Sequence, residues 1–192
     1  MRTTDGEILL RIARGSIEKA LGAGPAPKVE EAPWLREPGA TFVTLRRGES
    51  LRGCIGSIEA TRPLGEDVRR NALGAAFQDP RFPPVEPREW PGITVEVSLL
   101  SPPEPLPAVS EAEALRLLRP GIDGVVFEYG SHRSTFLPQV WEQLPDPRDF
   151  LDHLRQKAGL PGGFWAPEVR LSRYTVRKWD EADDPLSSRA SG

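Results

Sequence analysis

Residues 40–56 read ATFVTLRRGESLRGCIG, and they set the kind of sheet that this chain builds. An apolar and β-branched run over residues 40–45 is followed by a turn composition centred on Gly48, and a second run resumes at Leu51. Two such runs, separated by a short turn that contains glycine, are typical of a β-hairpin. The stretch therefore predicts antiparallel pairing, with Cys54 on the second strand.

The same patterns extend over the rest of the chain. Apolar residues at intervals of three and four predict helices, and strict alternation of apolar with polar residues predicts strands. Helices are expected over residues 8–21, 64–77, 147–158 and, in a short form, after Ser110; further strands are expected over 93–99, 123–129, 134–140 and 169–176. Four prolines in residues 81–91 predict an irregular surface arm. Strands joined by hairpins and helices, without regular strand-helix alternation, indicate an α+β protein with antiparallel pairing.

Composition excludes several classes of protein. A chain of 192 residues, 38% hydrophobic and 28% charged, is long enough for a substantial core and is not disordered as a whole. A formal charge of −3 gives no general attraction to nucleic acid or to anionic lipid, and leaves local recognition of nucleic acid open. The single cysteine, the polar N-terminus and the absence of a long apolar run predict a cytoplasmic protein that does not enter a membrane.

Cys54 is the first candidate for chemistry. Gly53 and Gly56 flank it, and glycines can leave the main chain uncovered and free to take positive φ, so that a ligand approaches closely. The thiol is then a nucleophile whose pKa Arg52 lowers, or else a small buried hydrophobic group. The two glycines have an alternative explanation, since glycine is also favoured at a bulge in a twisted hairpin.

Four other side chains are candidates beside that thiol. Arg52 has the forked geometry that binds phosphate or carboxylate, although an exposed, solvated arginine fits the sequence equally. Asp79 and Arg81 are an acid-base group and an anion-binding group, or parts of a helix terminator, Asp-Pro-Arg. Glu96 lies on the polar face of a strand, where it either lines a cleft and transfers protons or meets water.

Two further predictions concern binding. The neutral amide of Gln139 is suited to orienting a base edge or a carbonyl group, or to an ordinary loop hydrogen bond. His132 and His153 do not combine with Cys54 into a spacing typical of metal sites. We therefore expect no bound metal and no cofactor.

Several segments in this order resemble the AMMECR family. They are residues 51–56 (LRGCIG), 71–82 (NALGAAFQDPRF), 95–100 (VEVSLL), 123–125 (DGV) and 136–140 (FLPQV). The resemblance covers residues 5–180 as a single domain, and residues 181–192 are expected to form a flexible tail. Ser57 stands where relatives commonly have threonine.

The resemblance implies an α+β fold with a larger lobe built on an antiparallel sheet flanked by helices. It also implies a smaller second lobe, and a cleft between the lobes that collects the characteristic residues. Relatives are often encoded with, or fused to, MEMO-like and radical-SAM proteins. This association implies these partners and a place in a modification pathway that acts on a nucleobase or a small metabolite, but it implies no particular reaction.

Two classes of function follow from these residues. In the first, the protein is an enzyme or an accessory subunit of that pathway: Cys54 supplies a thiolate or a hydrogen bond, Arg52 or Arg81 holds an anionic group, and Glu96 or Asp79 moves a proton. In the second, the protein is a binding or adaptor module without catalytic activity, whose cleft receives a partner.

Overall fold

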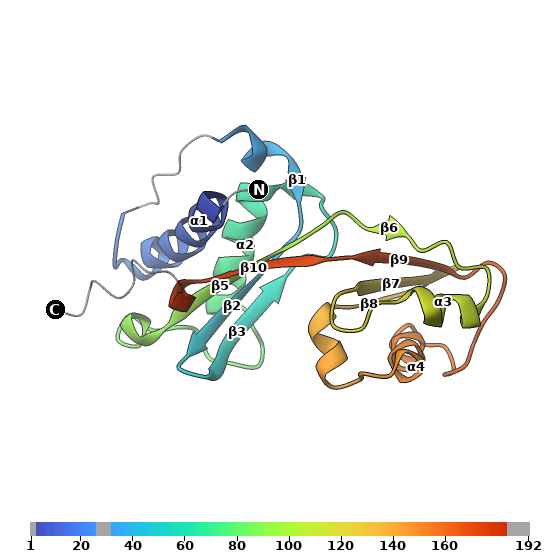
Figure 1. Cartoon of the computed structure of the whole chain (residues 1–192). Coiled ribbons are helices and arrows are strands. Elements are labelled where there is room, and N and C mark those ends of the chain that lie inside the picture. The colour runs from blue at the N-terminus through green and yellow to red at the C-terminus, as the bar shows by residue number, and fades with distance from the viewer. Residues whose placement is uncertain (1–2, 26–31, 184–192) are drawn as a thin grey trace. The chain divides into compact units, whose positions relative to one another are not determined.

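The computed structural model describes residues 3–25 and 32–183 of the chain, which fall into two compact units. The first unit contains the described residues up to Leu100 together with those from Arg177 onward, and the second is Ser101–Val176. Both units combine helices with antiparallel sheets, as Figure 1 shows, so the predicted α+β class is confirmed.

The first unit is built on a four-stranded sheet with the strand order β10-β5-β2-β3. Its strands are β2 (Thr41–Arg47), β3 (Ser50–Gly56), β5 (Thr94–Leu100) and β10 (Val176–Asp180), and its helices are α1 (Thr3–Leu21) and α2 (Leu64–Phe77). A second, two-stranded sheet pairs β1 (Pro38–Gly39) with β4 (Arg62–Pro63), and short 3-10 helices span Pro33–Arg36, Trp90–Gly92 and Glu181–Asp183. The predicted hairpin and the predicted helix over residues 64–77 are confirmed.

Both helices of the first unit pack on the same face of this sheet (Figure 1). The apolar side chains that α1, α2 and the strands turn toward one another are fully buried; they include Leu9, Ile12, Ile17, Val43, Leu45, Val68, Val95 and Val97. Burial of such side chains removes apolar surface from water and stabilises the layer. The opposite face of the sheet carries the alternate positions of each strand, and among the described residues of this unit neither α1 nor α2 packs on it.

The second unit has its own sheet and its own core. The strand order is β6-β9-β7-β8, with β6 (Glu104–Pro105), β7 (Gly124–Tyr129), β8 (His132–Phe136) and β9 (Arg170–Tyr174). Its helices are α3 (Glu111–Leu117), α4 (Pro147–Lys157) and a 3-10 helix at Pro138–Glu142. In the core, the rings of Trp141 and Phe150 stack with their centroids 3.7 Å apart.

Helix α4 begins and ends as its sequence predicts. The Asp146 side chain accepts hydrogen bonds from the backbone N–H groups of Arg148 and Asp149, and Pro147 occupies the first turn. Gly159 follows the helix with a φ of 83°, a left-handed conformation that glycine adopts without steric cost. Local capping chemistry therefore fixes both ends of α4.

Two predicted strands differ from the structure. The strand expected over residues 134–140 is β8, which ends at Phe136, because Pro138 lacks a backbone N–H and begins a 3-10 helix. The strand expected over residues 169–176 is two strands, β9 and β10. Of the predicted tail, Glu181–Asp183 forms a 3-10 helix, and residues 184–192 lie outside the described residues.

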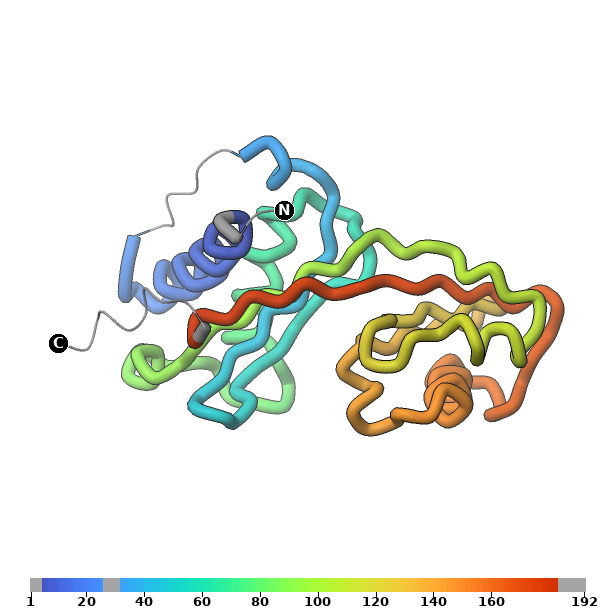
Figure 2. The backbone as a smooth tube through the Cα atoms, in the orientation of Figure 1, coloured from blue at the N-terminus to red at the C-terminus, as the bar shows by residue number. Residues whose placement is uncertain are grey.

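The chain enters and leaves the second unit at neighbouring points. Figure 2 shows the two segments running side by side, and the backbone N–H of Ser101 donates to the carbonyl oxygen of Thr175 at 2.9 Å. The N–H of Thr175 in turn donates to Ser101 Oγ at 3.0 Å. No helix over the described part of the chain has the length and apolar character needed to cross a membrane.

Candidate functional site

Three polar residues form a row across the sheet of the first unit. Thr44 on β2 is the register partner of Cys54 on β3 and of Glu96 on β5. Gly53 and Ile55 approach α2, so the residue between them points to the other face, which no helix of this unit covers. Thr44 Oγ1 lies 3.4 Å from Cys54 Sγ and donates a hydrogen bond to it.

The backbone of Cys54 is held from outside the sheet. Strand β3 is at the edge, where outward-facing N–H and C=O groups have no neighbouring strand. Here the N–H of Cys54 donates to Asp79 Oδ2 at 2.9 Å, and Arg81 Nη2 donates to the carbonyl oxygen of Cys54 at 3.1 Å. The Asp79 and Arg81 side chains thus replace a strand at this edge, and they bring three predicted site residues together.

Asp79 is buried and saturated with hydrogen bonds. Besides the Cys54 N–H, its carboxylate accepts from the backbone N–H, Nε and Nη2 of Arg81 at 3.1, 2.9 and 2.7 Å. The hydrogen bond from the Arg81 guanidinium holds the pKa of Asp79 well below its usual range, although burial acts in the opposite direction. A carboxylate of such low basicity is a poor proton acceptor. Of the two alternatives for Asp79, these hydrogen bonds fit a structural group that positions the Cys54 backbone and the Arg81 guanidinium better than an acid-base group.

The thiol of Cys54 lies next to a positive charge. The hydrogen bond to Asp79 is the main cause that raises the pKa of Arg81, and the Cys54 thiol contributes in the same direction. The thiol is half-buried, and 54% of the Arg81 side chain is exposed. A guanidinium and a hydroxyl donor therefore both interact with this sulfur.

Glu96 is buried, which corrects the alternative that it faces the solvent from the polar side of its strand. Only 7% of it is exposed, and its Oε2 lies 2.6 Å from Lys178 Nζ and 3.8 Å from Arg46 Nε. The contact with Lys178 is an ion pair without hydrogen-bond geometry. Each step across an antiparallel sheet is about 5 Å, so the backbones of Glu96 and Cys54 are about 10 Å apart. Thr44 therefore stands between Glu96 and the thiol in this row.

Arg52 turns toward the proline-rich arm. The register shifts so that Leu45 pairs with Gly53 while Arg46 pairs with Leu51, which leaves Arg52 as the extra residue of a β-bulge. Its Nε and Nη2 donate to the Glu89 carboxylate at 3.1 and 2.6 Å. This fork-to-fork pair lowers the pKa of Glu89.

The two glycines around Cys54 serve packing, and the expectation of an uncovered main chain at these positions is not met. Neither Gly53 nor Gly56 is among the described glycines with positive φ. A Cβ atom at Gly53 would lie 2.1 Å from the carbonyl oxygen of Ala75, and one at Gly56 would lie 2.2 Å from the Phe42 ring. Protein atoms thus occupy the space that a ligand would need.

The remaining predicted residues lie in the second unit. Gln139 is exposed on the 3-10 helix Pro138–Glu142. Both histidines contact backbone carbonyl oxygens: His132 Nδ1 lies 2.9 Å from that of Ala158, and His153 Nδ1 lies 2.8 Å from that of Asp149. Over residues 3–25 and 32–183, no three His, Cys, Asp or Glu side chains gather as metal ligands.

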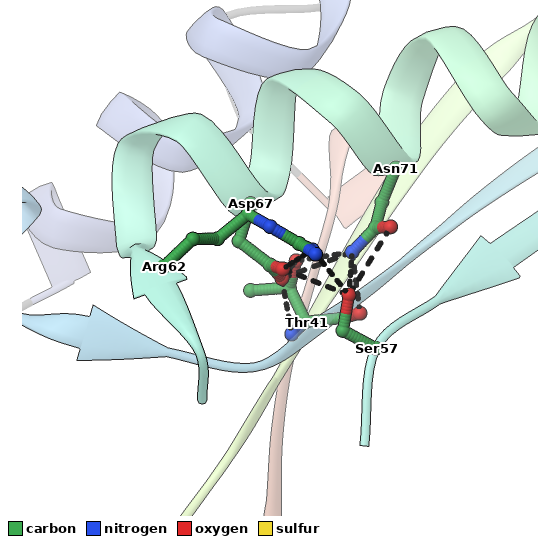
Figure 3. A network of polar contacts seen from close by, with 5 residues as sticks. All are labelled: Thr41, Ser57, Arg62, Asp67 and Asn71. Carbon is green, nitrogen blue, oxygen red and sulfur yellow. Dashed lines mark hydrogen bonds and ion pairs between the residues drawn. The ribbon is translucent and has the colours of Figure 1, made fainter. Parts of the chain in front are cut away.

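Sequence reasoning missed a buried polar network, which Figure 3 shows. Its centre is Asp67, with no exposed surface. Asp67 Oδ2 accepts from the backbone N–H and the hydroxyl of Thr41 at 2.8 and 2.7 Å, and from Asn71 Nδ2 at 2.9 Å. Asp67 Oδ1 accepts from Ser57 Oγ and Arg62 Nη1, both at 2.8 Å. Because every contact of this carboxylate is internal, the network fastens α2 to the ends of β2 and β3.

A signal for this network was present in the sequence. Asp67 and Asn71 are four residues apart, and they are flanked by Val68 and Ala72 on the buried side of α2. Polar residues at helical spacing beside an apolar stripe must find hydrogen-bond partners when that stripe is buried. The hydrogen-bond partners of Asp67 and Asn71 lie on other elements, and the sequence near these two residues does not indicate which they are.

The fold and this site define an α+β protein with antiparallel sheets and a half-buried cysteine, fixed at a sheet edge by an Asp-Arg pair. The chain belongs to the AMMECR1 family, whose model matches residues 10–179. It is similar to a protein of Methanothermobacter thermautotrophicus, 41% identical over 92% of this chain and 94% of the relative, and to one of Thermococcus gammatolerans, 40% identical over 92% and 90%. The crystal structure of the uncharacterised protein PH0010 from Pyrococcus horikoshii matches with a TM-score of 0.80 and 35% identity, covering 97% of this chain and 95% of that one.

Proposed function

We propose that the protein is an enzyme of a modification pathway that uses Cys54 as a thiolate nucleophile in group transfer to or from a small metabolite or nucleobase. The observation that carries the proposal is the half-buried thiol beside the Arg81 guanidinium, on a sheet face without a helix of its own unit. The thiolate attacks an electrophilic carbon of the donor, whose leaving group departs with the bonding electrons, and the acceptor then displaces the thiolate from the transferred group. One group transfer thus becomes two easier steps.

Each contact around the sulfur has a role in this chemistry. The Thr44 hydroxyl donates to Sγ at 3.4 Å and so stabilises negative charge on the sulfur. Arg81 supplies positive charge, and Asp79 fixes the direction of that guanidinium through two side-chain hydrogen bonds. Since half of the Arg81 side chain is exposed, the same guanidinium is available to an anionic group of a substrate. The MEMO-like and radical-SAM partners stay a prediction of the family association.

The proposal is tested by the rate of Cys54 alkylation with iodoacetamide at neutral pH. We expect the folded protein to react faster than a free cysteine under the same conditions, because the thiolate is the reactive form. Arg81→Gln removes the neighbouring positive charge and should slow the reaction. Arg46→Gln is the matched control, because Arg46 lies on β2 and pairs with Glu96 rather than with the thiol.

Cys54→Ser separates the catalytic role from a packing role. We expect this variant to keep the free energy of unfolding of the parent protein within about 0.5 kcal/mol, since a half-buried thiol contributes little apolar burial. A thiol that reacts only after unfolding, with a marked loss of stability in the serine variant, would refute the enzyme proposal. That result would favour the binding or adaptor module.

A further inference from the structure

A second site lies in the first unit, between the turn end of the β2–β3 hairpin and the proline-rich arm that follows α2. It is a hollow of about 450 Å³, lined by Arg47, Arg52, Pro83, Pro84, Glu86, Arg88 and Glu89. Cys54 does not line it. Its volume falls in the range of about 300–1,000 Å³ in which proteins bind small molecules.

The charges around this hollow do not cancel. Arg52 is paired with Glu89, and Arg88 Nε lies 2.6 Å from Glu86 Oε2. Arg47 is the third guanidinium; its field contributes to lowering the pKa of Glu89, and its side chain is exposed. The lining therefore carries an excess of one positive charge.

Arg52, one of the lining residues, has a buried donor without a partner. Nη1 of Arg52 has no hydrogen bond within the described residues, although only 12% of the Arg52 side chain is exposed. A guanidinium does not lose its proton and has no lone pair to offer, so its partner must bring an acceptor atom. A buried donor without an acceptor costs about 1–3 kcal/mol, and such a group in a folded protein calls for a ligand, an ion or a water molecule.

We propose that this hollow binds the oxyanion group, a carboxylate or a phosphate ester, of a small molecule. The exposed Arg47 guanidinium supplies the unbalanced positive charge and donates to an oxygen of that group, and a rotation of the Arg52 guanidinium turns its buried Nη1, which lacks an acceptor, toward a second oxygen. Pro83 and Pro84 offer an apolar wall to the rest of the molecule. Glu86 and Glu89 disfavour ligands with many negative charges. The proposal concerns binding alone and holds whether or not the Cys54 thiol is reactive.

The test is a titration of the full chain with inorganic phosphate and, separately, with succinate, at constant ionic strength set by chloride. Heat of binding and the Nε–H resonance of Arg52 in ¹⁵N-edited NMR spectra report the interaction. We expect saturable binding of at least one probe with a shift of that resonance. Arg47→Gln, which leaves the Arg52–Glu89 pair in place, should weaken binding about tenfold, the worth of one charge-assisted interaction.

Further variants make the result specific. Arg52→Lys keeps the charge and removes Nη1, so it should also weaken binding about tenfold. Arg70→Gln removes an exposed positive charge on α2 and should leave the affinity unchanged, as should Cys54→Ser. Binding of phosphate alone identifies a phosphate ester, and binding of succinate alone identifies a carboxylate. No saturable binding of either probe, or binding that neither Arg47→Gln nor Arg52→Lys weakens, overturns the proposal.

Discussion

At the scale of single residues, the same hydrogen bonds stabilise the charge of the Asp79 carboxylate and hold Arg81 in place. The carboxylate accepts from the Cys54 backbone and from three nitrogen atoms of Arg81, and these contacts exist only in the folded protein. Its negative charge is therefore stabilised by folding, which also fixes the guanidinium next to the thiol. Two consequences follow, one for the thiol chemistry and one for stability in acid.

The acid prediction follows from the direction of the pKa shift. The pKa of Asp79 is lower in the folded chain than in the unfolded chain, so its contribution is complete above the unfolded value near 4 and is lost as the pH falls toward the folded value. As the pH falls from about 5 to about 2, the unfolding free energy of Asp79→Asn should therefore decrease by about 2 kcal/mol less than that of the parent. Urea titrations at a series of pH values measure this difference.

The control for this prediction is Glu142→Gln, which changes an exposed carboxylate on the 3-10 helix of the second unit. The unfolding free energy of this variant should fall with decreasing pH by the same amount as that of the parent. Equal acid dependence of Asp79→Asn and the parent would contradict the role given to the Asp79–Arg81 pair.

Single residues also show what the sequence cannot predict. The pattern of residues 93–99 placed Glu96 on the polar face of its strand, but its partner Lys178 lies 82 positions further along the chain. Arg52 likewise pairs with Glu89, 37 positions away. Periodicity tells which face a side chain takes, whereas the groups that cover it come from distant segments. The functional assignment of both residues therefore had to wait for the structure.

At the scale of elements, the close approach of α2 to β3 depends on Gly53. The carbonyl oxygen of Ala75 on α2 occupies the place where a side chain at this position would begin. The same contact sets which face of β3 is turned to the helix, so it also turns Cys54 to the other face. A residue flanking the thiol thus acts through packing.

Gly53→Ala should destabilise the protein by about 1–3 kcal/mol or more, because its Cβ would lie 2.1 Å from a backbone atom that belongs to a helix. Chemical unfolding monitored by circular dichroism measures the loss. Gly92→Ala is the matched control, since a Cβ there meets no atom within 4 Å and its φ is not positive. A stability loss no larger than that of the control would disprove the packing role.

Elements were predictable where their signals are local. The capping residues Asp146 and Gly159 lie within a turn of the helix ends that they define. The strand order β10-β5-β2-β3 has no such local signal. β10 and β5 are neighbours in the sheet, but the whole second unit separates them in the sequence. The Asp67 network was missed for the same reason: it draws hydrogen bonds from several elements at once.

At the scale of the whole molecule, the second unit is an insertion in the first. The first unit takes strand β10, from Arg177 onward, after the second unit ends, and each unit has its own cluster of buried apolar residues. The inserted segment begins at Ser101 and ends one residue after Thr175, the residue to which Ser101 is hydrogen-bonded. The topology of the first unit therefore needs only a short connection between these two residues.

Deleting residues 102–174 and joining Ser101 to Thr175 through Asn-Gly should leave the first unit folded, because this dipeptide forms the two-residue turn that best joins antiparallel strands. We expect a single cooperative thermal transition with an unfolding enthalpy of about 0.7 kcal/mol per residue near 60 °C. Calorimetry and a dispersed ¹H–¹⁵N spectrum check this outcome. Glu181→Ala in the shortened chain is a second measurement: Glu181 accepts from Arg14 Nη2 at 2.6 Å and from the Val95 N–H at 2.9 Å, so its loss should lower the melting temperature. A shortened chain without a cooperative transition would show that the first unit depends on the inserted segment.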